Sequence, residues 1–343
     1  MAASIENPYW LGWLSSLVVE PELTPPAALA PAKFFCLLDD LPLHLLPPRE
    51  QCALPGERAL FVNPCCSFAP APILPEEVRE SSALLSGFAL QGNMAWITNP
   101  ATGALLPFWL GAELSHSLHQ ATPGGLEPEG LSPAQRRILL AAGVLVEQDH
   151  IARCCAAWNE ISARGRDHFR RKGYLTVRDL IHPFHIAALR RYYRQLVRTG
   201  KLLLGDSQCP RRYGVHNEPA TRFFHHQLAG AISDCVGEKI KPSYVYTGCY
   251  LGGAVLEKHT DREQCEFSLS LCLDYSPEPA RHTGWPLRLE ADGSQISVQQ
   301  GIGDGLIYMG CKLPHYRYAL PSGHTSTSIF FHFVRESFQG SLD

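Results

Sequence analysis

The sequence predicts an α+β protein, with a C-terminal half built as an antiparallel β barrel or sandwich and an N-terminal region that is mainly helical. Short runs of alternating apolar and polar residues fill the second half, for example 244–250, 267–274 and 326–333. Such alternation is typical of strands with one buried face. Turn sequences such as Gly303-Asp304-Gly305 separate these runs. Short strands with frequent turns favour an antiparallel barrel or sandwich.

Length and composition restrict the class of protein further. A chain of 343 residues is long enough for one or two domains. The net charge of −3 provides no basic surface for nucleic acid, and 18% charged with 45% hydrophobic residues favours a compact fold over disorder. Residues 1–19 lack the basic start of a signal peptide, and the longest uncharged apolar run, Ile138–Val146, is too short to span a membrane. We therefore expect a cytoplasmic enzyme that binds neither nucleic acid nor membranes.

The cysteines indicate buried thiols rather than a metal cluster or disulfides. The chain has 12 of them but no Cys-x-x-Cys motif, and the adjacent pairs Cys65-Cys66 and Cys154-Cys155 fit neither a zinc ribbon nor a disulfide scaffold. Free cysteine is among the most buried residue types. We expect reduced, mostly buried thiols.

The N-terminal region, residues 1–155, is expected to be an accessory module. Prolines interrupt residues 20–80, where the runs 34–38 and 59–62 fit strands or single helical turns equally. Residues 93–98 alternate like a strand and precede a turn at 99–103.

A helix is predicted to begin after Ser132. Ser132 is a good N-cap, Pro133 suits the first helical position, Gln135 completes a capping box and Gly143 ends the helix. With the extended residues 144–146, this segment is similar to part of a winged-helix fold, although a helical cap on the barrel is the favoured interpretation. As a separate module, it would bind peptide or protein.

The segment from 149 to 171 is predicted to be a connecting helix with a solvated, charged face that includes Arg164, Arg166, Arg170 and Arg171. Residues 173–181 follow it, and two amphipathic helices come next, at 183–200 and about 219–236. Their apolar stripes are expected to pack on the barrel.

Two groups of polar residues in or near the second amphipathic helix are weaker candidates for a functional site. His225 and His226 are adjacent on that helix, so they point about 100° apart and are poorly placed to chelate one ion. Arg211-Arg212-Tyr213-Gly214, just before it, fits either a substrate mouth or a plain surface loop.

The strongest chemical signal is His259-Thr260-Asp261 together with the more distant His315. Strand side chains repeat with period 2, so His-x-Asp places an imidazole and a carboxylate on one face. A histidine from another strand can complete three ligands and leave the other side of a metal ion open. Two histidines and one carboxylate form the ligand set of non-haem Fe(II) oxygenases.

Several motifs occur around these residues in a fixed order. Gly253-Ala254-x-Leu256 precedes the His-x-Asp triplet, Gly303-Asp304-x-Leu306-Ile307-Tyr308 precedes His315, and Pro321-x-Gly323 follows it before a last strand. Over residues 170–335, this order resembles the 2-oxoglutarate/Fe(II)-dependent dioxygenase superfamily, nearest its prolyl-hydroxylase-like branch. The resemblance implies a double-stranded β-helix of the jelly-roll or cupin-like type, at 156–337, with iron at one mouth and helices bracing it. It also implies that residues 173–181 form the opening strand.

The resemblance also implies site residues. Fe(II) would be bound by His259, Asp261 and His315, the last favoured over His324 and His332. The family places a cation about ten residues after the distal histidine and a hydroxyl two residues later, to bind the far carboxylate of 2-oxoglutarate. This chain has Thr325 and Thr327 there.

A cation for 2-oxoglutarate must then come from elsewhere. Arg317 is the best replacement, since it lies two residues past His315 and its guanidinium pairs with carboxylates in bidentate fashion. Tyr244 or Tyr246 would donate a hydroxyl, and Thr327 or Ser328 would assist, depending on a strand register that the sequence leaves open.

The predicted activity is hydroxylation of an unactivated C–H bond, using O₂ and 2-oxoglutarate, with ascorbate as an additional candidate cofactor. Asp261 occupies the position that is small in the family's halogenases, which argues against halogenation. The expected substrate is an amino-acid side chain in a peptide or protein, or a small metabolite. Two alternatives remain: a cupin-like hydrolase or isomerase using Zn²⁺ or Mn²⁺, and a non-catalytic binding protein on the same scaffold.

Overall fold

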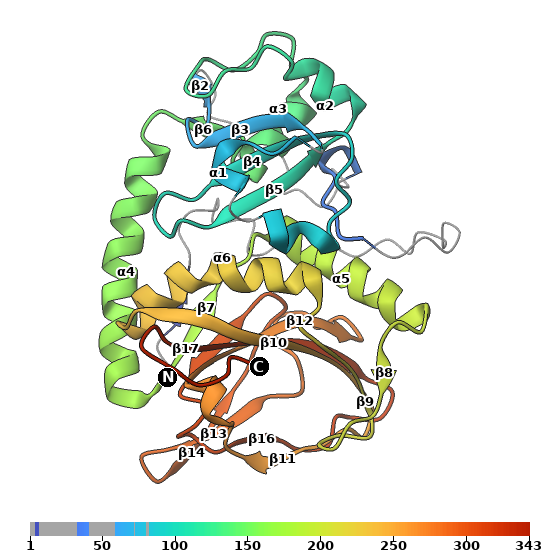
Figure 1. Ribbon diagram of the computed structural model, residues 1–343, viewed down its shortest axis with the longest axis vertical. Coiled ribbons are helices and arrows are strands. Elements are labelled where there is room, and N and C mark those ends of the chain that lie inside the picture. Colours follow the sequence, from blue (N-terminus) through green and yellow to red (C-terminus); the bar gives the residue numbers. More distant parts are fainter. Residues whose placement is uncertain (1–3, 7–32, 41–58, 72, 80–81) are drawn as a thin grey trace.

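The computed structural model describes residues 4–6, 33–40, 59–71, 73–79 and 82–343. Most of residues 1–19, which are predicted not to form a signal peptide, lie outside the described residues. The proline pairs Pro25-Pro26 and Pro47-Pro48 also lie outside them. Two β sheets facing each other form the lower half of the molecule, and helices separate them from a smaller N-terminal part (Figure 1).

The larger of the two facing sheets has eight strands in the order β1-β7-β15-β12-β17-β10-β9-β8. Their bounds are β1 Ser4–Glu6, β7 Tyr174–Arg178, β8 Leu203–Leu204, β9 Arg212–His216, β10 Ile240–Leu251, β12 Phe267–Ser276, β15 Gly305–Tyr308 and β17 Thr325–Arg335. Only β1 pairs in parallel, with β7.

The smaller facing sheet has four strands in the order β11-β16-β13-β14. Their bounds are β11 Leu256–His259, β13 Leu287–Ala291, β14 Ser294–Val298 and β16 His315–Arg317. Between β10 and β17 the chain passes repeatedly from one sheet to the other, so that β10, β12, β15 and β17 lie in the large sheet and the strands between them lie in the small one. This antiparallel winding is a double-stranded β-helix and confirms the predicted barrel.

Alternation along β17 decides which side chains reach the inside of the barrel. Phe330 and His332 line a cavity between the two sheets, whereas Ile329 and Phe331 belong to the core under the helices. Neighbouring residues of a strand point to opposite faces, so Ser326 and Ser328 share the inner face with Phe330.

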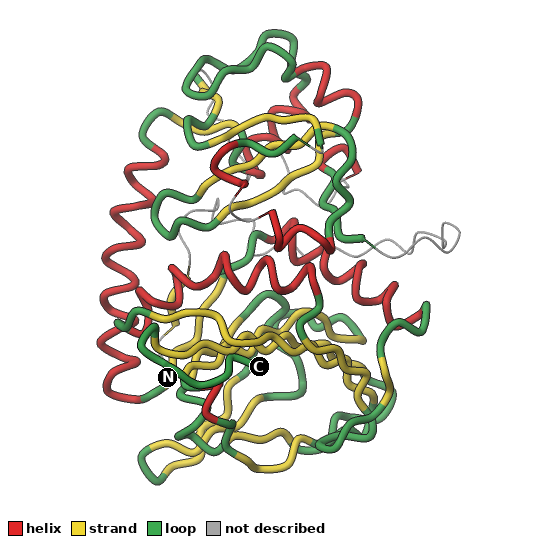
Figure 2. Tube along the Cα trace, in the orientation of Figure 1, coloured by secondary structure: helices red, strands yellow, loops and turns green. Residues whose placement is uncertain are grey.

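Three helices surround the large sheet. The helix α5 (Pro183–Arg198) contacts β12, and α6 (Pro219–Val236) contacts β10, so both cover its outer face (Figure 2). The helix α4 (His150–Lys172) packs against α6 and β7. Each of these helices begins and ends within two residues of the predicted position.

The N-terminal part contains more strand than the sequence predicts. Among its described residues, a three-stranded antiparallel sheet β3-β4-β5 lies beside short helices, and a two-stranded sheet pairs β2 with β6. The element bounds are β2 Leu60–Val62, β3 Cys66–Pro70, α1 Glu76–Arg79, β4 Asn93–Thr98, β5 Leu105–Leu110, α2 Ala112–Ser117, α3 Pro133–Ala142 and β6 Leu145–Glu147, with 3₁₀ turns η2 Leu38–Asp40 and η4 Ser82–Gly87.

The capping box predicted for α3 is confirmed, with Ser132 and Gln135 bonded reciprocally and Gly143 in the left-handed conformation. Neither the mainly helical N-terminal region nor the winged-helix arrangement is confirmed, because β3, β4 and β5 form a sheet of their own. The predicted boundary between residues 155 and 156 lies within α4, and the two-domain division stays a prediction.

One hydrophobic core joins the two parts of the molecule. It runs from Trp96 and Phe108 in the N-terminal sheet, through α5 and α6, to Phe331 and Phe333 on the outer face of the large sheet. The described cysteines are all free, and most are buried, as predicted. None of the described helices combines the length and apolar character that crossing a membrane requires.

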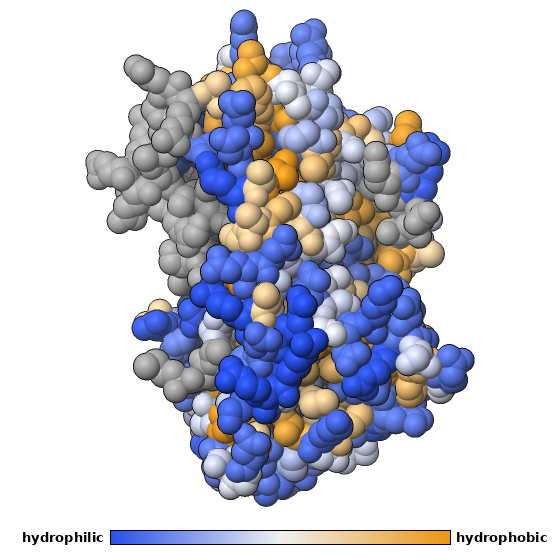
Figure 3. Space-filling model, turned by 90° about the vertical axis from the view of Figure 1, so that its left-hand side faces the viewer, coloured by the Kyte–Doolittle hydropathy of each residue, from blue (hydrophilic) through white to orange (hydrophobic). Residues whose placement is uncertain are grey.

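The solvent face of α4 carries the expected charges. Arg164, Arg170 and Arg171 are exposed, whereas Arg166 is half-buried and donates from Nε to the carbonyl of Asp234. Figure 3 shows hydrophilic side chains covering much of the lower part of this side of the molecule, with more apolar surface above. The prediction of a solvated helix face is confirmed for the three exposed arginines.

Buried neutral histidines join α5 to the N-terminal part and predict acid sensitivity. Burial lowers the pKa of His185 to about 4 and holds the pKa of His182 well below its usual range. Both are neutral when folded, so their contribution to stability is complete above the unfolded pKa of about 6.5 and is lost as the pH falls from there toward 4. Each should contribute a slope of about 1.4 kcal/mol per pH unit in that window.

Urea unfolding between pH 7.5 and pH 4.5 would measure this slope. His185 is stacked on Phe108 with ring centroids 4.6 Å apart and leaves Nδ1 without a partner, so phenylalanine is a conservative replacement. His185→Phe should reduce the slope by the contribution of one histidine. An unchanged slope would contradict the assignment.

Candidate metal centre

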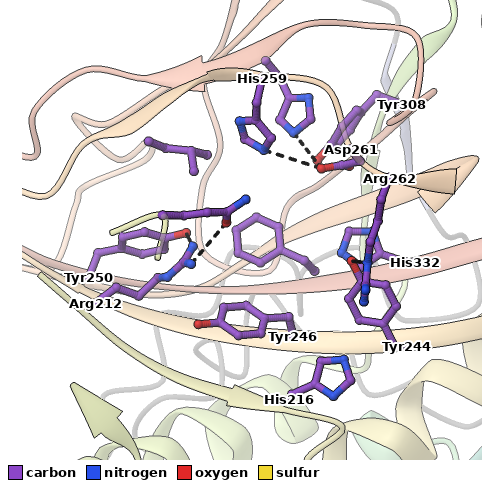
Figure 4. A pocket seen from close by; sticks show the side chains of 14 residues that line it. Arg212, His216, Tyr244, Tyr246, Tyr250, His259, Asp261, Arg262, Tyr308 and His332 are labelled. Carbon is purple, nitrogen blue, oxygen red and sulfur yellow. Dashed lines mark hydrogen bonds and ion pairs between the residues drawn. The ribbon is translucent and has the colours of Figure 1, made fainter. Parts of the chain in front are cut away.

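The three predicted metal ligands meet at one mouth of the barrel. His259 at the end of β11 and His315 at the start of β16 are directly paired across the small sheet, and their ring centroids are 4.3 Å apart. Asp261 follows two residues after His259 and places Oδ1 3.5 Å from His259 Nε2 and 3.4 Å from His315 Nε2 (Figure 4). Two donors bound about 2.1 Å from one first-row metal ion are separated by about 3.0–3.4 Å, so this spacing fits a metal site.

Backbone carbonyls set the orientation of both imidazoles. Nδ1 of His259 is 2.8 Å from the carbonyl oxygen of Glu257, and Nδ1 of His315 is 3.0 Å from that of Leu313. A carbonyl only accepts, so Nδ1 donates in each ring, and Nε2, which points toward Asp261, is the nitrogen left to bind a metal ion. Metal-binding histidines are held in this way in many proteins.

Asp261 is ionised and tightly held. Burial alone would raise the pKa of this carboxyl, but the adjacent imidazoles of His259 and His315 hold it well below its usual range. Ser268 Oγ donates to Oδ2 at 3.0 Å, and the backbone N–H of Asp261 donates to the carbonyl of Gly310. A Cβ at Gly310 would lie 2.5 Å from Oδ2, so glycine is required there for this packing.

The ligand atoms open onto a cavity of about 210 Å³ between the two sheets. Its walls are mostly aromatic and basic, and the labelled side chains in Figure 4 enclose it from several strands. The lining residues are Gln208, Arg212, His216, Tyr244, Tyr246, Tyr250, Leu256, His259, Asp261, Arg262, Tyr308, His315, Phe330 and His332. A three-ligand site on such a cavity leaves room for further ligands on the metal.

Arg317 is buried farther inside the barrel and is only 3% exposed. Its Nη1 donates to the carbonyl of Trp285 and its Nη2 to Gln300 Oε1, whereas Nε has no partner. Burial lowers the pKa of the guanidinium, and Tyr250 and Tyr308, which line the metal cavity, lie close enough to influence it. No ion pair is found for Arg317 among the described residues.

Two hydroxyls near Arg317 also lack partners. Ser270 Oγ and Ser328 Oγ are buried without hydrogen bonds. Gln300 connects Arg317 to the carbonyl of Ser270, and Ser328 lies opposite Cys272 in the sheet. A buried cation beside unpaired hydroxyls fits an anionic ligand such as a carboxylate.

The other residues predicted to bind 2-oxoglutarate lie in two places. Tyr244 and Tyr246 line the metal cavity. Thr325 and Thr327 do not: they line a separate cavity with Tyr193 and Arg194 of α5, outside the barrel. The reason is the alternation along β17, which directs odd-numbered residues at this end toward the helices.

The role of Arg212, which lines the cavity, could not be assigned from the sequence. Arg212 is only 4% exposed, and its guanidinium donates to Asp206 and to the hydroxyl of Tyr250. Tyr246 donates to the same Asp206 carboxylate at 2.6 Å. The sequence marked the Arg211-Arg212 pair as a candidate for a substrate mouth or a surface loop. The structure places Arg212 at the cavity and Arg211 at the surface.

Ser268→Ala is expected to weaken metal binding without disturbing the ligands themselves. The hydroxyl orients Asp261, and removing a residue that hydrogen-bonds a metal ligand commonly reduces metal affinity by roughly 10- to 100-fold. Competition with a metal-binding dye would measure the affinity. Ser270→Ala, two residues along the same strand face, is the matched control and should leave the affinity for metal alone unchanged.

Comparison with known proteins gives similarity to solved structures only. No family model and no curated protein matches the chain. It is similar to a Pseudomonas putida prolyl-4-hydroxylase, with 18% identity, 50% of this chain and 98% of that chain covered, and a TM-score of 0.40. It is also similar to a Trichoplax adhaerens prolyl hydroxylase in complex with a peptide fragment of hypoxia inducible factor, with 13% identity, 52% and 91% covered, and a TM-score of 0.44.

A third similar structure is the epimerase SnoN in complex with Fe³⁺, α-ketoglutarate and nogalamycin RO. Its identity is 12%, with 52% of this chain and 86% of that chain covered and a TM-score of 0.40.

Proposed function

We propose that this chain is an Fe(II)- and 2-oxoglutarate-dependent oxygenase that hydroxylates an unactivated C–H bond. One observation carries the proposal: two imidazole Nε2 atoms and one carboxylate oxygen converge at 3.4–3.5 Å on an open cavity. Two neutral nitrogen donors and one carboxylate on one side of an ion are the ligand set that non-haem Fe(II) oxygenases use.

His259, Asp261 and His315 would hold the iron. The Asp261 carboxylate offsets one positive charge, and the fixed imidazoles add neutral donors. The opposite side of the ion would face the cavity, where a chelating keto acid and O₂ can bind.

Arg317 would bind the far carboxylate of 2-oxoglutarate, with Ser270 or Ser328 adding a hydroxyl. Each of these three side chains has a buried polar atom without a partner, and Tyr250 and Tyr308 of the cavity lining lie close to Arg317. Tyr244 and Tyr246 stay candidates for a hydroxyl contact, because both line the cavity. The hydroxyl of Tyr246 would have to leave Asp206, and that of Tyr244 would have to leave Cys265.

The bound iron, with 2-oxoglutarate and O₂, would supply the oxidation, releasing succinate and CO₂. The chain contributes binding, orientation and exclusion of water. The aromatic walls formed by Tyr246, Tyr250 and Phe330 reduce the polarity around the reacting bond. The substrate, a side chain of a peptide or a small metabolite, would enter past His216 and Arg262, two exposed residues of the cavity lining.

An anaerobic Fe(II) titration with and without 2-oxoglutarate tests the proposal. A weak visible charge-transfer band should appear only when Fe(II) and 2-oxoglutarate are both present, and Zn²⁺ or succinate in place of either should give none. Tight metal binding with no band would overturn the oxygenase assignment. It would favour instead a cupin-like hydrolase or isomerase using Zn²⁺ or Mn²⁺.

A further inference from the structure

A second group of potential metal ligands lies directly beside the first. The ligand atoms of Asp261, Cys265 and His332 are all within 4.8 Å of one another. Asp261 belongs to both groups, and its two oxygens face different neighbours: Oδ1 faces His259 and His315, and Oδ2 faces Ser268. The mechanism proposed above uses neither Cys265 nor His332.

The hydrogen bonds of Ser268 determine the tautomer of His332. Ser268 Oγ lies 3.0 Å from Asp261 Oδ2 and 2.9 Å from His332 Nδ1. An ionised carboxylate only accepts, so the single hydroxyl proton of Ser268 is donated to Asp261. Ser268 Oγ must then accept from Nδ1–H, which leaves Nε2 of His332 with a free lone pair.

Cys265 faces polar groups, which is unusual for a buried cysteine. It ends the 3₁₀ turn η5 (Glu263–Cys265), only four residues after Asp261, and is fully buried. Its Sγ lies 3.1 Å from the hydroxyl of Tyr244. The ring of Tyr244 is in turn packed on His332, with centroids 4.6 Å apart. Thiol, imidazole, carboxylate and phenol therefore surround one point inside the barrel mouth.

We propose that Asp261, Cys265 and His332 form a second metal site, specific for a thiophilic dication such as Zn²⁺, and that the Asp261 carboxylate is shared between the two sites. Thiolate, imidazole and carboxylate are the three donor types that zinc binds, whereas Fe(II) in the neighbouring site has no sulfur ligand. Tyr244 or a water molecule completes the four ligands. The thiol proton is released to solvent as the metal binds.

The shared carboxylate would couple the two sites. A zinc ion on Oδ2 withdraws negative charge from Oδ1, which weakens the attraction of Asp261 for a second dication. This regulatory consequence depends on the proposed function: zinc would lower Fe(II) affinity and inhibit the oxygenase. The existence of the second site does not depend on it.

Cobalt titration of the reduced full-length chain tests the site, because Co²⁺ bound to a thiolate has a near-ultraviolet charge-transfer band that nitrogen and oxygen ligands do not give. We expect this band in the unaltered chain and in Cys311→Ser, the control at a neighbouring cysteine. Cys265→Ser should lose the band, and its affinity for the second ion should fall more than the roughly 10- to 100-fold seen when a residue supporting a ligand is removed. His259→Ala should keep the band, because His259 belongs only to the first site.

The possible results separate the two proposals. Absence of the sulfur band, or its persistence in Cys265→Ser, would overturn the second site, whatever the Fe(II)–2-oxoglutarate band does. A sulfur band in a chain that forms no Fe(II)–2-oxoglutarate band would support the second site and refute the oxygenase. With both bands present, Zn²⁺ should weaken the Fe(II)–2-oxoglutarate band more in the unaltered chain than in Cys265→Ser, where it can only compete directly for the first site, and equal weakening in both would disprove the coupling.

Discussion

Asp261→Ala is expected to abolish the Fe(II)–2-oxoglutarate band and to reduce metal affinity more than any other single change in the chain. Asp261 supplies the only negative charge in the His259–His315 group, and its pKa is held well below the usual range. Removing a residue that merely supports a metal ligand costs roughly 10- to 100-fold in affinity, so losing the charged ligand itself should cost more than about 100-fold.

Anaerobic titration followed by the visible band measures this loss, and circular dichroism checks the fold. Asp261→Asn is the matched variant, because it keeps the shape of the side chain and removes only the charge. Both variants should lose the band and bind metal more weakly. A band that keeps its intensity in Asp261→Ala would mean that the metal is bound elsewhere, and the site would have to be reassigned.

The barrel and the candidate ligands were predictable because their signals are local. His-x-Asp places two ligands on one strand face by period alone, and a single cross-strand pairing, His259 with His315, completes the group. The helices α5 and α6 carry their own start signals, Pro183 and Pro219, and regular apolar stripes. None of these features depends on knowing how distant strands are aligned.

The faces of β17 were not predictable, because they depend on register. A shift of one residue exchanges the inner and outer sides of a strand, and nothing in residues 325–335 fixes that choice locally. The positions expected to bind 2-oxoglutarate, Thr325 and Thr327, consequently lie on the helix side of the sheet. The Cys265–His332 group was not predictable for a similar reason, because β17 brings together residues that are far apart in the sequence.

The strand β5 of the N-terminal sheet was not predictable for a different reason. Residues 105–110 follow the turn predicted at 99–103, and they pair along the whole of β4. Every residue of β5 is buried, so its sequence has no polar alternation to indicate a strand. A fully buried short strand has the same periodicity signal as a buried piece of helix.

Arg317→Met is expected to abolish 2-oxoglutarate binding while leaving the affinity for Fe(II) alone unchanged. The guanidinium is buried without an ion pair in the described structure, and its Nε has no hydrogen-bond partner. Leaving a buried charged group without its partner costs about 2–5 kcal/mol, so 2-oxoglutarate should bind roughly 30- to 5,000-fold more weakly. Thr327→Val, on the opposite face of the large sheet, is the control and should bind 2-oxoglutarate normally.

Stability gives a second and independent measure of the role of Arg317. A buried charge without an opposite charge is unfavourable, and replacing it by an apolar side chain of similar length is often neutral or stabilising. Arg317→Met should therefore unfold at the same or a higher urea concentration than the unaltered chain, apart from about 1 kcal/mol for the hydrogen bonds to Trp285 and Gln300. A residue kept for structure would give the opposite pattern, with a large loss of stability and intact 2-oxoglutarate binding. Only the combination of lost binding and retained stability identifies Arg317 as a cation held in place for a carboxylate ligand.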